Sequence, residues 1–241
     1  NLDSWGFYIT LFMFFVGLSA GGLIISSIPN AFGMKGFGDI SRVAIWTSIC
    51  CTCVAIGFVV GLLAGILLSR IPHRLSGFII PILSIFQTIP GLVFIGVLFI
   101  WWGNIYPTVI VALSVYAMFP VLKNTYTGIL AVESRYVEAA KGCGMSPLQT
   151  LLQVELPLAM PSIVAGLRMA AIYTVSWAVL ASMIGLGGLG DFVYQGTNSN
   201  NNTLILLGAI PAALLVILLG WLVDLLQKKV TPRGMQKEGG K

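Results

Sequence analysis

Long apolar runs, separated by short polar or helix-breaking stretches, dominate the chain. Each run reaches the roughly 20 residues that an α-helix needs to cross the hydrocarbon core of a bilayer. With Pro, Gly and charged residues taken as breakers, the pattern predicts six transmembrane helices, at residues 7–28, 43–69, 78–101, 107–127, 162–184 and 203–227. The runs are continuously apolar and do not alternate, which excludes a β-barrel. We therefore expect an all-α, polytopic membrane helix bundle.

Two prolines interrupt the third predicted helix. Pro81 and Pro90 both lie within residues 78–101. A proline has no amide proton, and its ring clashes with the carbonyl group four residues earlier. We therefore expect a kink or a break in this helix, which a membrane tolerates where protein or a water-filled cavity covers the freed backbone groups.

The overall composition agrees with a membrane protein. The 241-residue chain is 57% hydrophobic and only 9% charged, and its mean hydropathy is +0.96. The formal net charge is +5. No basic run is interleaved with exposed aromatic residues, so the charge does not indicate nucleic-acid binding.

The basic residues gather on one side of the predicted bundle. Residues 70–77, residues 128–161 and the C-terminal tail all fall on this side and carry most of the Lys and Arg. The opposite side holds only Lys35 and Arg42, partly offset by Asp39. The positive-inside bias assigns the basic side to the cytoplasm. Both termini are therefore expected to be cytoplasmic.

A polar stretch, "EAAKGCGMSPLQTLLQVELP" at residues 138–157, interrupts the apolar pattern between the fourth and fifth predicted helices. It lies on the cytoplasmic side and predicts two short helices joined by a turn. The first helix runs to about Lys141 and stops at Gly142 or Gly144, because glycine suits a left-handed C-terminal cap. A protein partner is a natural use for such a segment outside the membrane.

The second short helix has a clear start. Ser146 is suited to the N-cap, Pro147 to the first helical position, and Gln149 completes a capping box. Pro157 is expected to end this helix. An apolar ridge with a polar margin falls at helical spacing, at Leu148, Leu151, Leu152 and Glu155.

The same stretch resembles the EAA signature of ABC-importer permeases. Three consecutive residues open the signature, a glycine follows after three more, and a Val-x-Leu-Pro ending follows after another nine. The family has Ile where this chain has Val154, which is a mild departure. The resemblance implies a type I ABC-importer permease fold whose cytoplasmic loop, at residues 128–161, docks on an ATPase. The residues implied in this coupling are Glu138, Ala139, Ala140, Gly144, Val154, Leu156 and Pro157.

Further stretches narrow the resemblance. The segments "QTIPGLVF", "FPVLKNTYTGIL", "LPLAMPSIVAGLRMA" and "IGLGGLGDFVYQG" are similar to permeases of osmoprotectant uptake. That subfamily carries glycine betaine, carnitine, choline and similar quaternary amines. The resemblance covers about residues 61–235 and implies one permease domain there, followed by a tail at residues 236–241.

The resemblance also implies partners and a location. A permease of this kind pairs with a second copy or a sibling permease, joins two cytoplasmic ATPase subunits and receives substrate from an extracytoplasmic binding protein or domain. It lies in the bacterial inner membrane. ATP and Mg²⁺ belong to the ATPase, so no cofactor is expected in this chain. The sequence contains no GxxxxGK[ST] phosphate loop, and we expect this chain not to be an enzyme.

Residues 1–60 do not extend this resemblance. The segment "WGFYITLFMFFVGLSAGGLIISSIPNAFG" looks like the start of the quinol-interacting membrane subunits of polysulfide- and nitrite-reductase-type complexes. Small residues stand where that family has its small-residue motif, at Gly17, Ser19, Ala20 and Gly21. Residues 1–60 are therefore a transmembrane region of uncertain affiliation: a divergent first helix, a fusion or a misassigned segment. The alternative function is a membrane anchor for a redox enzyme.

Candidates for the lining of the translocation path are found in the third and fourth predicted helices, at Gln87, Thr88, Pro90, Trp101 and Tyr116. Trp101 belongs to an aromatic cluster with Trp102 and Tyr106 at an outer helix end, where an aromatic belt is expected. A cation–π site for a quaternary ammonium is the alternative reading of that cluster.

Three other motifs indicate little chemistry. "GLGGLG" at residues 185–190 follows a membrane helix and not a strand, so it predicts a flexible outer turn and no dinucleotide site. His73 is the only histidine, which argues against a His-based metal site. Cys50 and Cys53 form a CxxC within an apolar run, where small thiols are expected to pack and not to react.

Two charged residues fall in or near apolar spans. A charge at the bilayer centre costs on the order of 3 kcal/mol, so each needs a partner or an exit. Arg168 is expected to extend to the cytoplasmic interface, with substrate contact as the alternative. Asp224 is expected to pair with Lys228, four residues later on the same helix.

Overall fold

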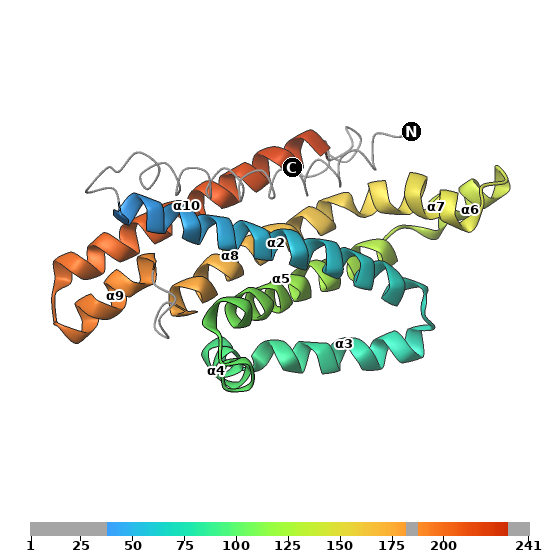
Figure 1. Cartoon of the computed structure of the whole chain (residues 1–241). Coiled ribbons are helices and arrows are strands. Elements are labelled where there is room, and N and C mark those ends of the chain that lie inside the picture. The colour runs from blue at the N-terminus through green and yellow to red at the C-terminus, as the bar shows by residue number, and fades with distance from the viewer. Residues whose placement is uncertain (1–37, 182–187, 231–241) are drawn as a thin grey trace.

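The computed structural model describes residues 38–181 and 188–230, and within them it contains helices and no strand (Figure 1). The predicted all-α fold is confirmed. The helices, with the labels of Figure 1, are α2 (Gly38–Arg70), α3 (His73–Thr88), α4 (Gly91–Trp102), α5 (Ile105–Leu130), α6 (Ser134–Gly142), α7 (Pro147–Thr150), the π-helical turn η1 (Leu151–Glu155), α8 (Leu156–Ala181), α9 (Leu189–Asn198) and α10 (Asn202–Val230). The helix predicted at residues 7–28 lies outside the described residues.

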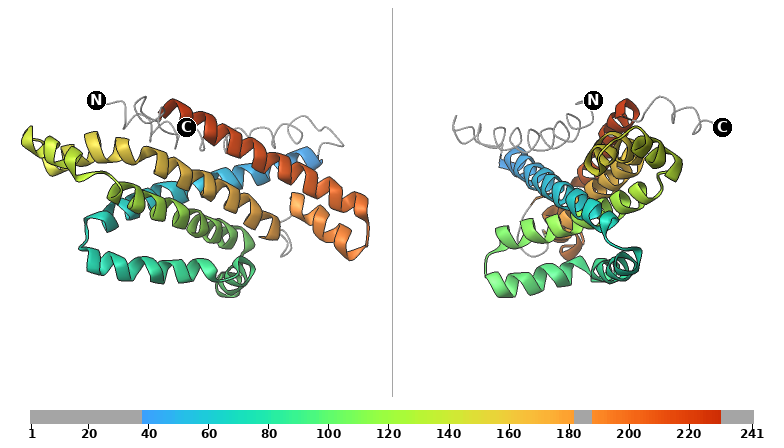
Figure 2. Two further views of the ribbon diagram at one scale, coloured as in Figure 1. Left: turned by 180° about the vertical axis from the view of Figure 1, so that it is seen from behind. Right: turned by 90° about the vertical axis from the view of Figure 1, so that its right-hand side faces the viewer.

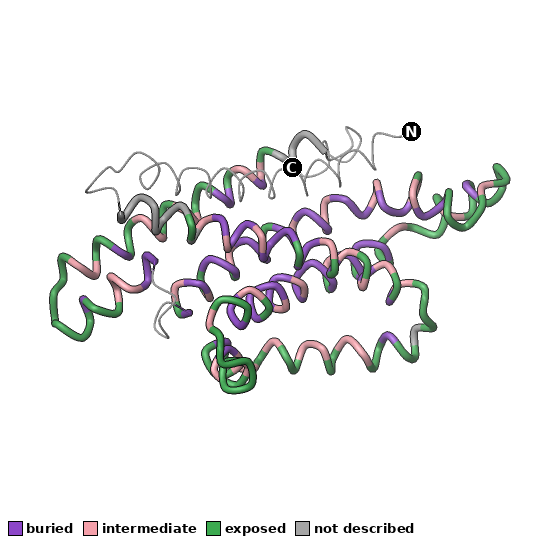
Figure 3. The backbone as a smooth tube through the Cα atoms, viewed as in Figure 1, coloured by how far each residue is buried: buried purple, intermediate pink, exposed green. Residues whose placement is uncertain are grey.

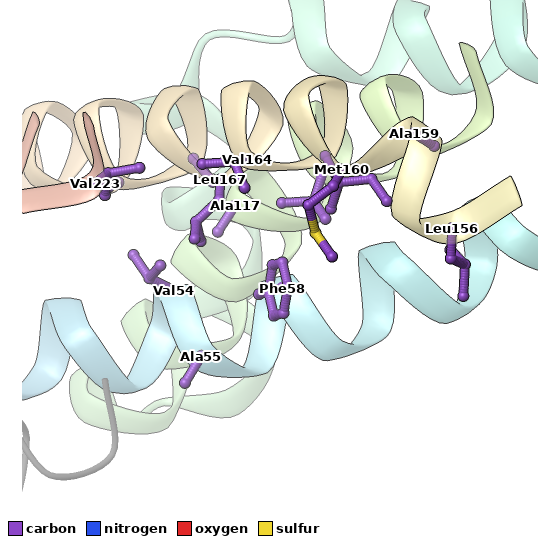
Figure 4. Packing of buried hydrophobic residues seen from close by; sticks show 14 of the residues in the cluster. Val54, Ala55, Phe58, Ala117, Leu156, Ala159, Met160, Val164, Leu167 and Val223 are labelled. Carbon is purple, nitrogen blue, oxygen red and sulfur yellow. The ribbon is translucent and has the colours of Figure 1, made fainter. Parts of the chain in front are cut away.

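Three long helices form the centre of the bundle. α5 packs along both α2 and α8, and α10 packs on α8 and on α9. The broken pair α3 and α4 lies on the side of α5 away from α10 (Figures 1 and 2). The main core is therefore shared by α2, α5 and α8, and Figure 4 shows it with one contribution from α10. Its labelled residues are Val54, Ala55, Phe58, Ala117, Leu156, Ala159, Met160, Val164, Leu167 and Val223.

Burial is uneven across the bundle. Buried residues concentrate in the central helices, whereas α3, α4 and α10 expose most of their length (Figure 3). These exposed faces are apolar: Ile100 of α4 is 85% exposed and Ile217 of α10 is 66% exposed. Soluble proteins rarely expose apolar surfaces of this extent to water. Contact with lipid or with a neighbouring membrane subunit would cover them.

A glycine seam lets α2 approach α5 closely. Gly57, Gly61 and Gly65 recur every four residues along α2, and a Cβ atom on Gly61 would lie 2.6 Å from the carbonyl oxygen of Met118. Small residues at this spacing allow close backbone contact between membrane helices. The seam runs on both sides of residue 60, and α2 is continuous there. The affiliation of the segment before residue 60 stays a prediction.

Each membrane span that the sequence predicts within the described residues has a counterpart in the structure, although the start of the fifth differs. Four helices are long and apolar enough to cross a membrane, and a fifth span results if the bent pair α3–α4 counts as one. The bend is 87° and lies at Ile89 and Pro90. The predicted break of the third helix is therefore confirmed at Pro90, whereas Pro81 lies inside α3.

Two predicted boundaries at prolines are wrong. Pro157 does not end the short helix of the loop, and Pro161 does not precede the fifth span, because α7, η1 and α8 form one continuous helical segment of 35 residues, Pro147–Ala181. The π-helical turn ends at Glu155, two residues before Pro157, and the Leu156 amide donates to the Leu151 carbonyl five residues earlier. A π-helical turn is a local irregularity that an α-helix can contain without ending, and here the helix continues past the proline.

The segment that follows α8 is partly helical. Residues 185–187 of the expected flexible turn lie outside the described residues, but α9 begins directly after Gly188 and forms a hairpin with α10. Gly188 has φ of 96°, which favours glycine. A Cβ atom on Gly208 of α10 would lie 2.5 Å from the Leu189 carbonyl oxygen. The hairpin is therefore closely packed, and the prediction of a wholly flexible turn is wrong for α9.

Candidate functional site

The polar loop projects from one end of the bundle. α6 and α7 lie at the same end as the turn between α2 and α3, whereas the α9–α10 hairpin lies at the opposite end (Figures 1 and 2). The projecting end therefore carries the basic residues of both segments, Arg70, Arg74, Arg135 and Lys141. This arrangement matches the grouping of positive charge that the sequence predicts.

The first half of the loop ends in the predicted left-handed cap. α6 closes with two backbone bonds: the Gly144 amide donates to the Lys141 carbonyl at 2.9 Å, and the Met145 amide donates to the Ala140 carbonyl at 3.1 Å. Gly144 has φ of 80°. This pair of bonds is the Schellman motif. Of the two predicted stop residues, Gly144 supplies the left-handed conformation, and Gly142 is the last residue of α6.

The second half of the loop starts with the predicted capping box. The Ser146 hydroxyl oxygen accepts the Gln149 amide proton at 3.3 Å, and the Gln149 side-chain oxygen accepts the Ser146 amide proton at 2.8 Å. Pro147 occupies the first helical position. The reversal between α6 and α7 is thus fixed from both sides by local hydrogen bonds.

The residues of the EAA signature divide between the surface and the interior. Glu138 and Ala139 are exposed, whereas Ala140 and Leu156 are 5% and 4% exposed. Val154 and Pro157 are half-buried. The signature therefore presents its first residues outward and uses its last residues to join the loop to the core.

The apolar ridge of the second helix is mostly turned inward. Leu151 is buried in the main core and Leu152 packs against it, whereas Leu148 is 64% exposed. Of the apolar ridge that the sequence predicts, only Leu148 is therefore exposed.

An ion pair ties the loop to α2. Glu155, only 6% exposed, receives two hydrogen bonds from the guanidinium of Arg70, the last residue of α2, and one of them joins Nη1 to Oε1 at 3.4 Å. A buried carboxylate is costly unless it is paired and hydrogen-bonded. The sequence predicts Glu155 only as a polar margin, because a partner 85 residues earlier leaves no local pattern.

A second ion pair of the loop lies on its surface. Arg135 Nε lies 2.6 Å from a Glu133 carboxylate oxygen, and its guanidinium covers the ring of Tyr136 at 4.9 Å. The Glu133 carboxylate raises the pKa of Arg135 above its ordinary value. Both side chains of the pair are more than half exposed, and such pairs contribute little to stability.

A cavity of about 620 Å³ opens beside the break of the third helix. It brings together three of the predicted path residues, Gln87 and Thr88 of α3 and Tyr116 of α5. None of its lining residues is charged. The others are Ser84, Ile172, Tyr173, Ser176, Trp177 and Leu180.

Aromatic side chains hold the break next to this cavity. Tyr116 donates its hydroxyl proton to the Ile89 carbonyl at 2.7 Å, which satisfies a backbone group freed by Pro90. The Tyr116 ring stacks on Trp177 with centroids 5.1 Å apart and meets Phe94 edge-on at 5.6 Å. Gly91 at the start of α4 lies so close to Trp177 that an added Cβ atom would overlap the indole at 2.1 Å.

Two predicted path residues do not line the cavity. Pro90 caps α4 at the break, next to the cavity and outside its lining. Trp101, near the end of α4, is 85% exposed. The residues of α8 that complete the cavity, Tyr173 and Trp177 among them, were not predicted, since continuous apolar runs do not reveal which side of a helix faces a cavity.

The two charged residues of the spans pair with each other. Arg168 of α8 lies 3.4 Å from Asp224 of α10. The expected exit of Arg168 to the interface is therefore replaced by an ion pair between two helices. The side chain of Lys228, the expected partner of Asp224, lies outside the described residues.

Comparison with solved structures identifies the fold. The methionine ABC transporter MetNI, in an inward-facing conformation, contains a chain with a TM-score of 0.72 and 24% identity, over 80% of this chain and 96% of that one. An amino acid ABC transporter structure gives a TM-score of 0.65 at 18% identity, over 85% and 98%. The fold is thus that of a type I ABC-importer permease.

Sequence comparison places the chain within a family. The family model for the inner membrane component of binding-protein-dependent transport systems matches residues 57–235. The chain belongs to this family. A carnitine transport permease protein, OpuCB, of Listeria monocytogenes is 38% identical over 78% of this chain and 86% of its own length. The choline transport system permease protein OpuBB of Bacillus subtilis is 41% identical over 76% and 84%. The glycine betaine/proline betaine permease ProW of Escherichia coli is 32% identical over 91% and 62%.

We expect a double-mutant cycle to measure coupling between Arg70 and Glu155. Arg70→Ala, Glu155→Ala and the double variant should give a coupling of roughly 0.5–3 kcal/mol in the free energy of unfolding in detergent, because loss of Arg70 leaves a buried carboxylate unpaired. The exposed pair Arg135 and Glu133 is the matched control and should show no measurable coupling. Additive effects of the Arg70 and Glu155 substitutions would contradict a structural role for the pair.

Proposed function

We propose that this chain is the permease subunit of an ATP-driven importer that carries a small quaternary amine such as glycine betaine, choline or carnitine. The observation that carries the proposal is the match across residues 57–235 to relatives named for carnitine and choline transport, at about 40% identity. The uncharged cavity beside the α3–α4 break is the proposed part of the translocation path in this subunit.

The projecting loop is the proposed contact with a cytoplasmic ATPase. Glu138, Ala139 and Leu148 are all exposed at the end of the bundle. An apolar side chain rimmed by polar ones is typical of a small protein interface. ATP and Mg²⁺ bind to the ATPase in this proposal, and the energy of hydrolysis reaches the permease through the loop.

The remaining partners follow from the class of importer. An extracytoplasmic binding protein or domain delivers the substrate at the end opposite the loop. A second copy of this chain or a sibling permease covers part of the exposed apolar surface, and lipid of a bacterial inner membrane covers the rest.

Uptake measurements test the proposed substrate class. Cells that lack their own osmoprotectant uptake should accumulate labelled betaine, choline or carnitine when they express this permease with its ATPase and binding protein. Accumulation should stop when the ATPase partner cannot hydrolyse ATP. Transport of an amino acid or a bile-acid-like anion, with none of these amines, would defeat the proposal.

A natural cysteine tests the proposed orientation without a substitution. Cys143 is exposed in the loop, whereas Cys50, Cys51 and Cys53 are buried. A membrane-impermeant maleimide should label the protein in inside-out vesicles but not in intact cells. An Asn200→Cys variant in a Cys143→Ser background should give the reverse pattern, because Asn200 lies in the exposed α9–α10 turn. Labelling of Cys143 from outside would overturn the orientation and the docking proposal together.

Gly144→Val tests the coupling role of the loop. Valine at φ of 80° costs roughly 1 kcal/mol or more, although no atom would lie within 4 Å of its Cβ. We expect normal membrane insertion but weakened ATPase association, or ATP hydrolysis without uptake, in liposomes. Gly142→Val is the matched control, because Gly142 is equally open but lacks a positive φ. Normal transport and normal stimulation of the ATPase by loaded binding protein in Gly144→Val would show that the loop is not the coupling element.

A further inference from the structure

The cavity beside the α3–α4 break has a lining that favours positive charge, although none of its residues is charged. Three serine and threonine side chains line it, and the hydroxyl group of each donates its proton to its own helix backbone: Ser84 to Ile80 at 2.9 Å, Thr88 to Ile85 at 2.7 Å, and Ser176 to Ile172 at 2.9 Å. A hydroxyl group that has used its only proton in this way offers the cavity lone pairs alone. These three hydroxyls therefore favour positive charge and offer no donor to an anion.

Aromatic rings reinforce this preference. Tyr116, Tyr173 and Trp177 all line the cavity. Tyr116 and Trp177 stack on each other, which fixes both rings in the wall. Tyr173, one turn before Trp177 on α8, is 37% exposed, and no ring contact involves it among the residues that the structure describes. Aromatic faces attract a cation within about 6 Å of the ring centroid.

The absence of charge in the lining sets the kind of cation. A primary ammonium or a guanidinium must replace its hydration with hydrogen bonds from all its N–H groups, and without a carboxylate the lining has only the weaker, neutral acceptors for them. A quaternary ammonium has no N–H to satisfy, and its charge is spread over methyl groups that fit against aromatic and aliphatic walls. The lining supplies such walls, and its volume of about 620 Å³ lies in the roughly 300–1,000 Å³ range of small-molecule sites.

One side chain of the lining can contact the other end of a zwitterion. Gln87 carries amide protons, and no hydrogen bond involves its side chain among the described residues. An amide donates to a carboxylate without the strength of a charged partner. The cavity thus offers a separate contact to each end of a betaine and a strong contact to neither, which lets cargo leave.

From these contacts we propose that the permease itself contains a weak subsite for a quaternary ammonium group, formed by Tyr173, Tyr116 and Trp177 with the three hydroxyl oxygens. The proposal rests on the proposed function and adds that the translocation path selects its cargo by charge. Trp101, at 85% exposure near the end of α4, does not line this cavity.

Direct binding tests the subsite in the absence of the binding protein. The permease–ATPase complex in lipid nanodiscs is mixed with choline, and saturation-transfer NMR follows the N-methyl protons. We expect saturation of the methyl signal, competition by tetramethylammonium, and at least tenfold weaker competition by 3,3-dimethylbutan-1-ol, which has the shape of choline but no charge. Equal competition by the neutral alcohol, or no methyl saturation, would overturn the subsite.

Paired variants locate the subsite. Tyr173→Leu should weaken choline binding roughly 2- to 30-fold, the range of single cation–π contacts, whereas Tyr173→Phe keeps the ring and should retain binding. Trp101→Leu should leave binding unchanged. Equal binding by the two Tyr173 variants, or loss only in Trp101→Leu, would contradict the assignment. If Tyr173→Leu does not assemble, the competition by the neutral alcohol on the unchanged complex still decides.

The experiments distinguish a failure of the proposed function from a failure of the subsite. If cells with the complete transporter accumulate no quaternary amine, the proposed function is wrong and the subsite with it. If they do accumulate one, but binding to the complex does not depend on positive charge, only the subsite is wrong and selection belongs to the binding protein alone.

Discussion

Lipid offers backbone amide and carbonyl groups no hydrogen-bond partner, so each interruption of a membrane helix must be satisfied from within the protein. At the 87° bend between α3 and α4, the carbonyl of Ile89 receives the hydroxyl proton of Tyr116. Before Pro157, the helix widens into a π-helical turn and keeps its bonds internal. The first solution requires a tyrosine from α5 and a tryptophan from α8 at the bend, and the cavity is built from these same side chains.

The turn of the loop could be predicted from the sequence because it depends on hydrogen bonds between residues close together in the chain. Ser146, Pro147 and Gln149 predict a capping box, and Gly144 predicts a left-handed cap, because each bond involved spans only a few residues; the structure contains both. Contacts between residues far apart in the chain produce no such local sequence pattern. Two ion pairs join different helices: Arg70 with Glu155, and Arg168 with Asp224. The prediction that Pro157 ends the loop helix failed for a different reason, because the surroundings of a proline can accommodate it within a helix.

The cavity was predictable in part for the same reason. Pro90 marks the break, and backbone freed in a membrane needs a polar environment, so Gln87 and Thr88 before it were reasonable candidates. The residues across the cavity lie on α8. Within the long apolar run of that helix, nothing in the sequence distinguishes Tyr173 and Trp177 as lining residues. Only the packing of α8 on α5 shows which side of that run faces the opening. Trp101, which was a candidate because of its aromatic neighbours, does not line this cavity.

The continuous helix from Pro147 to Ala181 joins the two candidate sites into one element. Its 35 residues extend about 50 Å, well beyond the roughly 30 Å hydrocarbon core. One end carries the exposed Leu148 of the loop, and the other carries the tyrosine and tryptophan of the cavity wall. Between them lie the π-helical turn and Glu155, which Arg70 ties to α2. A displacement of the loop by a bound ATPase would therefore reach the cavity through one helix, and α2 would move with it or the ion pair would break.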